Sequence, residues 1–175
     1  MRRLLLLRHA TYAAVPGTAD PALSPAGWSE AATVGRFLRD HGLLPDLVLC
    51  SAARRARETR DAVLSAAGSA PALKTDEAVT QGDESALLAR IRDISGKCET
   101  VLVIGHNPTI HGLACILATA GPQEARKRLA HVYSPGTLTV LDLAAESWNE
   151  AGRGDGMLRD LFDPRADTAD HKVPG

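Results

Sequence analysis

The chain has 175 residues, of which 45% are hydrophobic and 23% are charged, and its formal net charge is -1. This composition is typical of one soluble globular domain, and it excludes disorder as the main state because enough apolar material is present to form a core. The balanced charge and the 3% content of aromatic residues argue against nucleic acid or an anionic membrane as a partner.

The cysteine pattern and the longest apolar runs indicate the compartment. Cys50, Cys98 and Cys115 form no C-x-x-C pair, and their odd number argues against a disulfide framework. We expect Cys50 and Cys115 to be buried thiols because both lie in apolar stretches. The apolar run at residues 4–7 is too short for a signal peptide, and no run approaches the ~20 residues of a membrane span. We therefore expect a cytoplasmic protein.

Four short runs predict β-strands. Residues 4–7, 46–50 and 100–104 are almost continuously apolar, as expected of strands that are buried on both faces. The third run is also rich in β-branched residues, which favour strands. Residues 137–143 alternate between polar and apolar side chains and predict a fourth strand.

Five helical patterns lie between these runs. Ser24 and Pro25 form an N-cap signal that begins the first helix, and the second covers about 53–67. The third has apolar residues at helical spacing, the fourth begins at Pro108, and a short charged helix spans 123–131. The residues that these helices should bury are Ala31, Val34 and Leu38 in the first, Leu87, Leu88, Ile91 and Ile94 in the third, and Ile110, Leu113, Ala114 and Leu117 in the fourth.

Strands that alternate with helices predict βαβ units. We therefore expect an α/β fold: a three-layer α/β/α sandwich with a mostly parallel central sheet. No internal segment has the composition of a linker, so we expect one domain over residues 1–162. Residues 163–175 form a polar tail with two prolines, which we expect to be loosely held.

Charged and polar side chains follow three of the predicted strands, and ligands of open α/β sheets bind beyond the carboxyl ends of the strands. The residues are Arg8 and His9 after the first strand, Ser51, Arg54 and Arg55 after the second, and His106 after the third. Two predicted helix N-termini at the same edge add positive partial charge. The sequence therefore predicts an anion site, and a phosphoryl group is the anion that best fits several arginines.

Taken singly, these residues also have ordinary structural interpretations. Ser51 could cap the second helix. Arg54, Arg57 and Arg60 recur at every third position, which fits a solvated basic helix face. A histidine that follows a strand is more often structural than catalytic. The combination at three successive strand ends is what favours a site.

The histidine spacing does not indicate a metal site. His106 and His111 are five residues apart, whereas two ligands on one helix face need the i, i+4 spacing. We therefore expect neither a metal nor another cofactor. His111 should flank the site or pack against the start of a helix, and we expect His41, His131 and His171 to be exposed in polar surroundings.

Three motifs resemble those of the histidine phosphatase superfamily, also called the phosphoglycerate mutase-like superfamily. Residues 8–10, Arg-His-Ala, resemble its Arg-His signature. Residues 51–59 resemble its second motif, with Arg55 and Thr59 at the motif positions. Residues 105–108, Gly-His-Asn-Pro, resemble its third motif. Arg-His alone is a weak signal, whereas all three motifs in order at strand ends are a strong one.

The late part of the chain resembles one branch of that superfamily. Residues 134–138 and the strand after them are similar to the small SixA-type phosphohistidine phosphatases. The resemblance runs in order from about residue 3 to about residue 164, which is nearly the whole chain. It implies the phosphoglycerate mutase-like version of the α/β fold.

The resemblance also implies a role for each motif residue. His9 would be the nucleophile that becomes phosphohistidine, Arg8 and Arg55 would hold the phosphoryl oxygens, and His106 would complete the phosphate pocket. The physical chemistry agrees, because flanking cations lower the pKa of a histidine and keep it neutral for attack. The same cations stabilise the negative charge on the transferring group.

The chain departs from the family pattern in two small residues and in the proton donor. Ala10 and Ala52 stand where many members have Gly and Pro, and neither change removes a catalytic group. Ester-cleaving members use a carboxylate between the second and third motifs to protonate the leaving oxygen. The candidates here are Glu77, Asp83 and Glu84, and Glu84 could instead cap the third helix.

SixA-type members are similar to this chain in lacking an obvious donor, and a phosphoramidate leaving group needs less acid help than an alkoxide. We therefore expect a phosphatase that transfers a phosphoryl group to His9 and then to water, with phosphohistidine in a protein as the substrate. Two alternatives stay open. One is a small-molecule phosphomonoester phosphatase or mutase of the same superfamily, and the other is a non-catalytic phosphate-recognition module. The partner is accordingly a phosphorylated protein or a small phosphorylated molecule.

Overall fold

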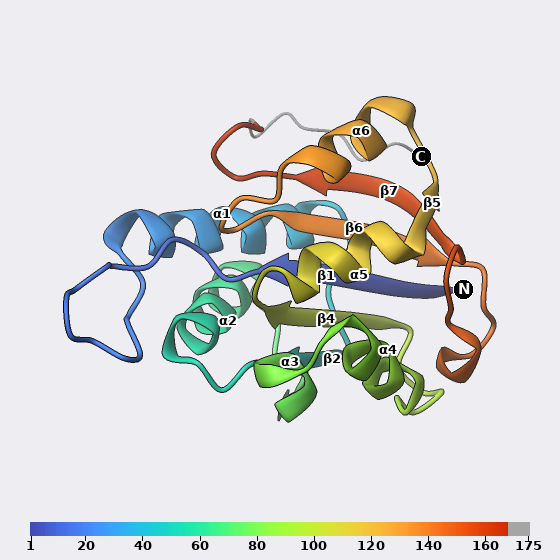
Figure 1. Ribbon diagram of the computed structural model, residues 1–175, viewed down its shortest axis with the longest axis horizontal. Coiled ribbons are helices and arrows are strands. Elements are labelled where there is room, and N and C mark those ends of the chain that lie inside the picture. The colour runs from blue at the N-terminus through green and yellow to red at the C-terminus, as the bar shows by residue number, and fades with distance from the viewer. Residues whose placement is uncertain (168–175) are drawn as a thin grey trace.

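The computed structural model describes residues 1–167, and within them seven strands form one mixed sheet in the order β3-β2-β4-β1-β6-β7-β5 (Figure 1). The strands are β1 (Arg2–Arg8), β2 (Leu47–Cys50), β3 (Ala72–Thr75), β4 (Thr100–Gly105), β5 (Ala118–Ala120), β6 (Leu138–Leu143) and β7 (Gly156–Phe162). The helices are α1 (Pro25–Asp40), α2 (Arg54–Ala67), α3 (Glu77–Gln81), α4 (Glu84–Arg92), α5 (Thr109–Leu117), α6 (Gln123–His131) and the short 3₁₀ helix η1 (Trp148–Glu150).

The helices cover both faces of the sheet, which confirms the predicted three-layer sandwich. One hydrophobic cluster joins α1 and α2 to one face of the strands. A second cluster joins α4, α5 and α6 to the other face, and Figure 1 shows α4 and α5 in front of the strands. The sequence pattern of strands and helices therefore predicted the layer arrangement correctly.

The sheet has a parallel part and a part with antiparallel pairs. The strands β3, β2, β4 and β1 pair in parallel, in that order. The strand β6 is antiparallel to both β1 and β7, whereas β5 pairs in parallel with β7. The predicted mostly parallel sheet is thus confirmed, and its parallel part contains the three strands that the motifs follow.

The central strand β1 is buried on both faces. Leu4 and Leu6 belong to the cluster beside α4 and α5, and Leu5 and Leu7 belong to the cluster beside α1 and α2. All four side chains are 0% exposed, and full burial of one leucine contributes about 2–3 kcal/mol. Because successive side chains point to opposite faces, β1 packs into both hydrophobic clusters. This packing fixes the position of the residues at its carboxyl end.

The ends of α1 and α2 follow the predicted signals. The Ser24 hydroxyl accepts a hydrogen bond from the backbone N–H of Gly27 at 3.1 Å, and Pro25 is the first helical residue. A Cβ at Gly27 would collide with the carbonyl of Thr11, so the start of α1 lies directly against the segment that follows β1. Gly68 ends α2 in the left-handed conformation, with φ of 65°.

Several sequence predictions differ from the structure in detail. The predicted helix at 123–131 is α6, and α5 begins at Thr109, one residue after the predicted start at Pro108. Ile94, predicted on the third helix, lies beyond the end of α4 at Arg92, although its side chain is buried. The sequence analysis did not predict the strands β3, β5 and β7 or the short helix α3. Cys50 is buried as predicted, whereas Cys115 is exposed because it lies on the outer side of α5.

The chain after β7 turns back on itself. The backbone N–H of Asp163 donates to the carboxylate of Asp167 at 2.7 Å, and Arg128 of α6 pairs with the same carboxylate at 3.1 Å. These contacts hold residues 163–167, which are the beginning of the segment predicted to be a loosely held tail. The remainder of that prediction, residues 168–175, lies outside the described residues.

Candidate active site

The predicted site residues meet at one edge of the sheet, because β2, β4 and β1 are neighbours and run in parallel. Figure 1 shows the arrows of β1 and β4 ending at the same side of the molecule. The backbone N–H of His9 donates to the carbonyl of Gly105 at 3.0 Å, which continues the ladder beyond the last residue of β1. We call Arg8, His9, Arg55 and His106 the histidine–arginine cluster.

His9 has a defined tautomer. Its Nδ1 lies 2.9 Å from the carbonyl oxygen of Ala10, and a carbonyl can only accept, so Nδ1 carries the proton. The Nε atom of Arg55 donates to His9 Nε2 at 3.3 Å. His9 Nε2 therefore presents its lone pair next to a guanidinium group, which is the arrangement of a neutral, nucleophilic imidazole.

The surroundings of His9 keep it unprotonated at neutral pH. Burial, which shields the side chain from water, is the main cause that lowers the pKa of His9 from 6.5 to about 4. The neighbouring His106, Arg55 and Arg8 act in the same direction, whereas the hydrogen bond to Ala10 opposes the shift. His9 is thus ready to attack an electrophile without first losing a proton.

His106 is held on both ring nitrogens. The Nη2 atom of Arg55 donates to its Nδ1 at 3.2 Å, and its Nε2 lies 2.7 Å from the hydroxyl of Ser51. Burial and the charges of Arg55 and Arg8 lower the pKa of His106 to about 4. The rings of His9 and His106 are 5.1 Å apart, and one guanidinium group bridges them.

Two hydroxyl groups support this geometry. The buried Thr59 hydroxyl accepts from the N–H of Ala10 at 3.0 Å and donates to the carbonyl of Arg55 at 2.7 Å, so it connects the first motif to the second. The Ser51 hydroxyl accepts from the N–H of Ala53 at 3.2 Å, and Ala53, rather than Ser51, is the N-cap residue of α2. The Ser51 side chain therefore holds His106 and stands just outside the helix.

The side chain of Arg8, the fourth member of the cluster, is partly buried. Its Nη1 donates to the carbonyl of Tyr133 at 2.7 Å, and the side chain of Asn107 donates to the same carbonyl at 3.0 Å. Tyr133 is fixed in turn, because its hydroxyl donates to the carbonyl of Leu6 and its ring stacks on His111. Among residues 1–167, Arg8 Nε is buried with no hydrogen-bond partner, and burial lowers the pKa of this guanidinium.

Two residues at the site were missed by the sequence analysis. Asp20 accepts from the backbone N–H of Arg54 at 2.8 Å and lies 4.0 Å from Nη1 of Arg55. The ring of Tyr12 lies 5.6 Å from the ring of His9, and the guanidinium carbon of Arg55 lies 5.5 Å from the Tyr12 ring. In the sequence, these two residues could have been singled out only by their position in the segment that follows Arg-His.

The position of Asp20 corrects one expectation about helix dipoles. The sequence analysis expected the N-terminus of α2 to add positive partial charge to the site. In the structure, the Asp20 carboxylate accepts from the first helical N–H of α2. The Asp20 carboxylate therefore offsets part of the positive partial charge of this helix end, and the full positive charges of the site are those of the arginine side chains.

The three candidate proton donors lie on or before α3 and α4. Glu77 accepts from the side chain of Gln81, and Asp83 is the N-cap of α4, accepting from the N–H of Ala86 at 2.8 Å. Glu84 packs against Gly112 of α5, so the predicted capping role of Glu84 belongs to Asp83. Within the described part of the chain, these three carboxylates form no hydrogen bond or ion pair with the histidine–arginine cluster.

The remaining candidates have structural surroundings. Arg54 pairs with Glu58 at 2.7 Å, and Arg54 and Arg57 are exposed, as a solvated basic face predicts. Arg60 pairs with Asp61 at 2.7 Å, but its side chain is mostly buried and departs from that interpretation. The predicted exposure of His131 is confirmed. His41 is instead partly buried, with its ring 4.3 Å from that of Phe37, and His171 lies outside the described residues.

Two further properties were searched for in residues 1–167. In that part of the chain, no cluster of three or more His, Cys, Asp or Glu side chains is arranged to hold a metal ion. The helices described there are also all too short or too polar to span a lipid bilayer.

Comparison with known proteins places this site in a family. Residues 4–80 match the model of the histidine phosphatase superfamily (branch 1). The chain is 31% identical over 163 residues to the uncharacterized protein Rv1276c of Mycobacterium tuberculosis, which covers 91% of this chain and 100% of that protein. It is 32% identical over 126 residues to the uncharacterized protein ML1117 of Mycobacterium leprae, which covers 71% of this chain and 76% of that protein.

Solved structures have the same fold. The structure named "Putative Phosphohistidine Phosphatase SixA from Nakamurella multipartitia" superposes with a TM-score of 0.82 at 29% identity, covering 94% of this chain and 97% of that one. The protein histidine phosphatase SixA complexed with tungstate has a TM-score of 0.75 at 20% identity, covering 93% and 97%, and supports the fold alone. The first of these structures covers nearly the whole chain, whereas the family model covers residues 4–80. The chain belongs to the histidine phosphatase superfamily, has its phosphoglycerate mutase-like fold, and is a phosphatase.

Proposed function

We propose that this phosphatase removes the phosphoryl group from phosphohistidine in a protein, through a covalent intermediate on His9. The observation that carries the proposal is the hydrogen bonding of His9. Its Nδ1 donates to Ala10, so the free lone pair is on Nε2, where Arg55 lies 3.3 Å away. A pKa of about 4 keeps this ring neutral at physiological pH.

In the first step, His9 Nε2 attacks phosphorus and forms a P–N bond. The P–N bond to the imidazole of the substrate breaks, and its electron pair goes to the substrate nitrogen. The substrate ring leaves as neutral imidazole when its other nitrogen already carries a proton. This step therefore needs no strong acid from the protein, unlike the departure of an alkoxide.

The charge that develops on the phosphoryl oxygens is met by Arg8, Arg55 and His106. Guanidinium groups match the oxygens of a phosphoryl group geometrically, and Arg8 Nε is buried without a partner among the described residues. His106 is neutral in the free protein, and an adjacent dianion favours its protonated form. The bound phosphoryl group thus favours protonation of His106, which adds a positive charge that stabilises the transition state.

In the second step, a water molecule attacks phosphorus and breaks the bond to His9 Nε2. Inorganic phosphate leaves, the water proton passes to solvent or to phosphate, and His9 returns to its neutral tautomer. The hydrogen bond from Nδ1 to the Ala10 carbonyl persists in both steps, because attack takes place on the opposite nitrogen. The same tautomer therefore serves every turnover.

The choice of phosphohistidine over a phosphate ester is supported by the position of the carboxylates. Glu77 is engaged with Gln81, Asp83 with the start of α4, and Glu84 packs against Gly112. Among the described residues none of the three bonds to the cluster, so an alkoxide has no proton donor hydrogen-bonded to it. Asp20 is the carboxylate that reaches Arg55, at 4.0 Å, and it is tied to the N-terminus of α2. The likeness to proteins named as phosphohistidine phosphatases supports the same substrate class.

The test is release of phosphate from a phosphohistidine-bearing protein by the wild type and by His9→Ala, with phenyl phosphate in parallel. We expect His9-dependent release from the protein and turnover of the ester that is at least about 10²-fold slower, because the ester lacks acid catalysis. Faster turnover of the ester would favour the small-molecule phosphatase or mutase instead. Near-wild-type activity of His9→Ala would refute the mechanism.

A further inference from the structure

The segment between β1 and α1 forms a loop at the mouth of the site, and we call residues 12–21 the mouth loop. Its base is closed by backbone hydrogen bonding. The N–H of Ala13 donates to the carbonyl of Ala22 at 2.9 Å, and Tyr12 and Leu23 form an isolated antiparallel bridge. Backbone hydrogen bonds therefore join the two ends of the loop, close to His9.

The tip of the mouth loop is a tight turn. The N–H of Thr18 donates to the carbonyl of Val15 at 3.1 Å, which closes a four-residue turn over Pro16 and Gly17. Proline at the second position and a glycine with φ of 80° at the third are the residues that a type II turn requires. This turn presents apolar side chains on a backbone with little conformational freedom.

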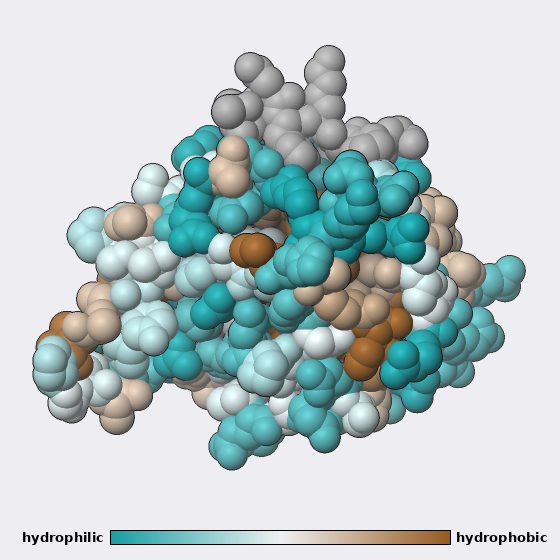
Figure 2. Space-filling model, turned by 45° about the horizontal axis from the view of Figure 1, so that its top comes forward, coloured by the Kyte–Doolittle hydropathy of each residue, from teal (hydrophilic) through white to brown (hydrophobic). Residues whose placement is uncertain are grey.

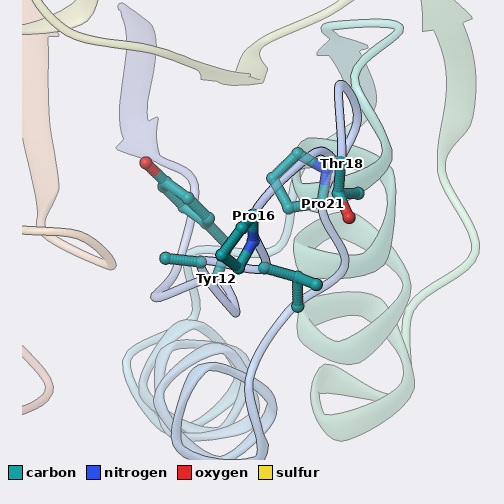
Figure 3. A pocket seen from close by; sticks show the side chains of 6 residues that line it. Tyr12, Pro16, Thr18 and Pro21 are labelled. Atoms are coloured by element: carbon teal, nitrogen blue, oxygen red, sulfur yellow. The ribbon is translucent and has the colours of Figure 1, made fainter.

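The mouth loop lines an open, largely apolar hollow of about 350 Å³ (Figure 3). Its lining residues are Tyr12, Ala14, Val15, Pro16, Thr18 and Pro21. This volume is at the lower end of the ~300–1,000 Å³ that is typical of ligand sites, and the lining side chains carry no charge. Val15 is 55% exposed and Tyr12 is 41% exposed, and Figure 2 shows brown and tan residues at the end of the molecule where the loop lies.

The hollow adjoins the histidine–arginine cluster, because Tyr12 is a neighbour of both. The ring of Tyr12 lines the hollow and also lies 5.6 Å from the ring of His9. When a phosphoryl group is bound against His9, the molecule that carries it must lie outside the cluster. In an extended chain, side chains two residues apart point to the same side and are about 7 Å apart, so the side chain two residues from the phosphorylated one lies on the side of the hollow.

From this adjacency we propose that the hollow of the mouth loop binds an apolar side chain of the phosphorylated protein, two residues from its phosphohistidine in the sequence. This inference rests on the proposed function and adds a selectivity to it. The lining offers apolar surface and little hydrogen bonding, so a leucine or similar side chain gains from burial there, whereas a serine does not. Partial burial of a leucine is expected to change kcat/KM by about tenfold.

The experiment compares two phosphohistidine peptides of equal length, one with leucine and one with serine at the second position on each side of the phosphohistidine. Phosphoimidazole, which is too small to fill the hollow, serves as the reference substrate. The variant is Val15→Ser, which is neutral and removes apolar surface without touching the cluster. The matched control is Leu73→Ser, because Leu73 on β3 is 53% exposed, close to the 55% of Val15.

We expect the wild type and Leu73→Ser to prefer the leucine peptide by about tenfold or more in kcat/KM. Val15→Ser should reduce this preference to about threefold or less and leave phosphoimidazole turnover unchanged. Equal turnover of both peptides by the wild type would overturn the proposal, as would a full preference in Val15→Ser. A Val15 dependence that is seen with phenyl phosphate but with neither peptide would also overturn it, because the hollow would then serve small aryl phosphates.

A binding measurement separates this inference from the proposed function. His9→Ala removes the nucleophile, and its dissociation constants for the two peptides can be compared without turnover. Tighter binding of the leucine peptide that depends on Val15 supports the hollow even if the wild type fails to release phosphate. Failure of phosphoimidazole hydrolysis refutes the proposed function, whereas equal dissociation constants refute the hollow.

Discussion

The histidine–arginine cluster and the mouth loop adjoin each other but are built in opposite ways. The cluster is charged, largely buried, and fixed by hydrogen bonds such as those of Thr59 and Ser51. The mouth loop is uncharged along its hollow, exposed, and fixed by its own backbone bonds. The cluster meets the phosphoryl group that every substrate shares, whereas the loop meets what differs between substrates. Changes in the cluster should therefore slow all substrates, and changes in the residues that line the hollow should slow selected ones.

The largest effect is expected for Arg55→Lys. Lysine keeps the positive charge, but it lacks the planar fork with which Arg55 contacts both His9 and His106. We expect kcat/KM to fall by about 10²–10³-fold for every substrate, which is the range for loss of a transition-state donor. Arg57→Lys, on the exposed side of the same helix, is the control and should retain activity. A fall limited to one of the two peptides would contradict the division of roles.

The second expectation concerns stability at low pH. The pKa of His9 is about 4 in the folded protein, against the ordinary 6.5 of an unfolded chain. As the pH falls from 7 to 4, the unfolded chain binds a proton at this position before the folded protein does. The folded state should therefore lose roughly 3 kcal/mol of unfolding free energy through His9. Urea unfolding of wild type and His9→Asn at both pH values measures this loss, and equal pH dependence of the two proteins would contradict it.

A smaller effect is expected for Thr59→Val. Valine has the same shape but leaves the buried N–H of Ala10 without its acceptor, at a cost of about 1–3 kcal/mol of unfolding free energy. Because Thr59 also ties the turn after His9 to Arg55, kcat should fall for both peptides alike. Thr59→Ser keeps the hydroxyl and should restore most of kcat. A Ser variant as slow as the Val variant would show that the methyl group, and not the hydrogen bonds, matters.

The smallest effect is expected for Asp20→Asn, and its sign is opposite. The Asp20 carboxylate lies 4.0 Å from Arg55 and partly neutralises it, while asparagine keeps the oxygen that accepts from Arg54. We expect inorganic phosphate to bind up to about fivefold more tightly, from an interaction of ~1 kcal/mol at this distance in water. Asp61→Asn, which removes an exposed carboxylate paired with Arg60, is the control. Weaker phosphate binding by Asp20→Asn would contradict the account.

The parts of the molecule that the sequence predicted well are those whose signals are local. The continuous apolar runs of β1 and β4 identify buried strands without knowledge of their partners. The residues that follow them meet because parallel neighbours end at the same edge. The convergence of His9, His106 and Arg55 could therefore be predicted, although the hydrogen bonds that select the tautomer of His9 could not.

The parts that were missed depend on distant contacts. The strand β7 contains Arg159 and Asp160, which break its apolar pattern, and it forms because it pairs with β6 and because Arg159 reaches Asp142 at 3.1 Å. The edge strand β3 is exposed throughout and has no burial pattern to detect. Asp20 reaches the start of α2 across 34 residues of sequence, so its carboxylate could not be placed at the site from spacing alone.

The central claim is that His9 carries the phosphoryl group on Nε2, and one measurement tests it directly. Wild type is mixed with phosphoimidazole, quenched in alkali to preserve acid-labile phosphohistidine, and the phosphoenzyme is mapped by peptide analysis and NMR. The account predicts a phosphoryl group on Nε2 of His9, because Nδ1 is occupied by its hydrogen bond to Ala10. A phosphoryl group on Nδ1 of His9, or on His106, would contradict it.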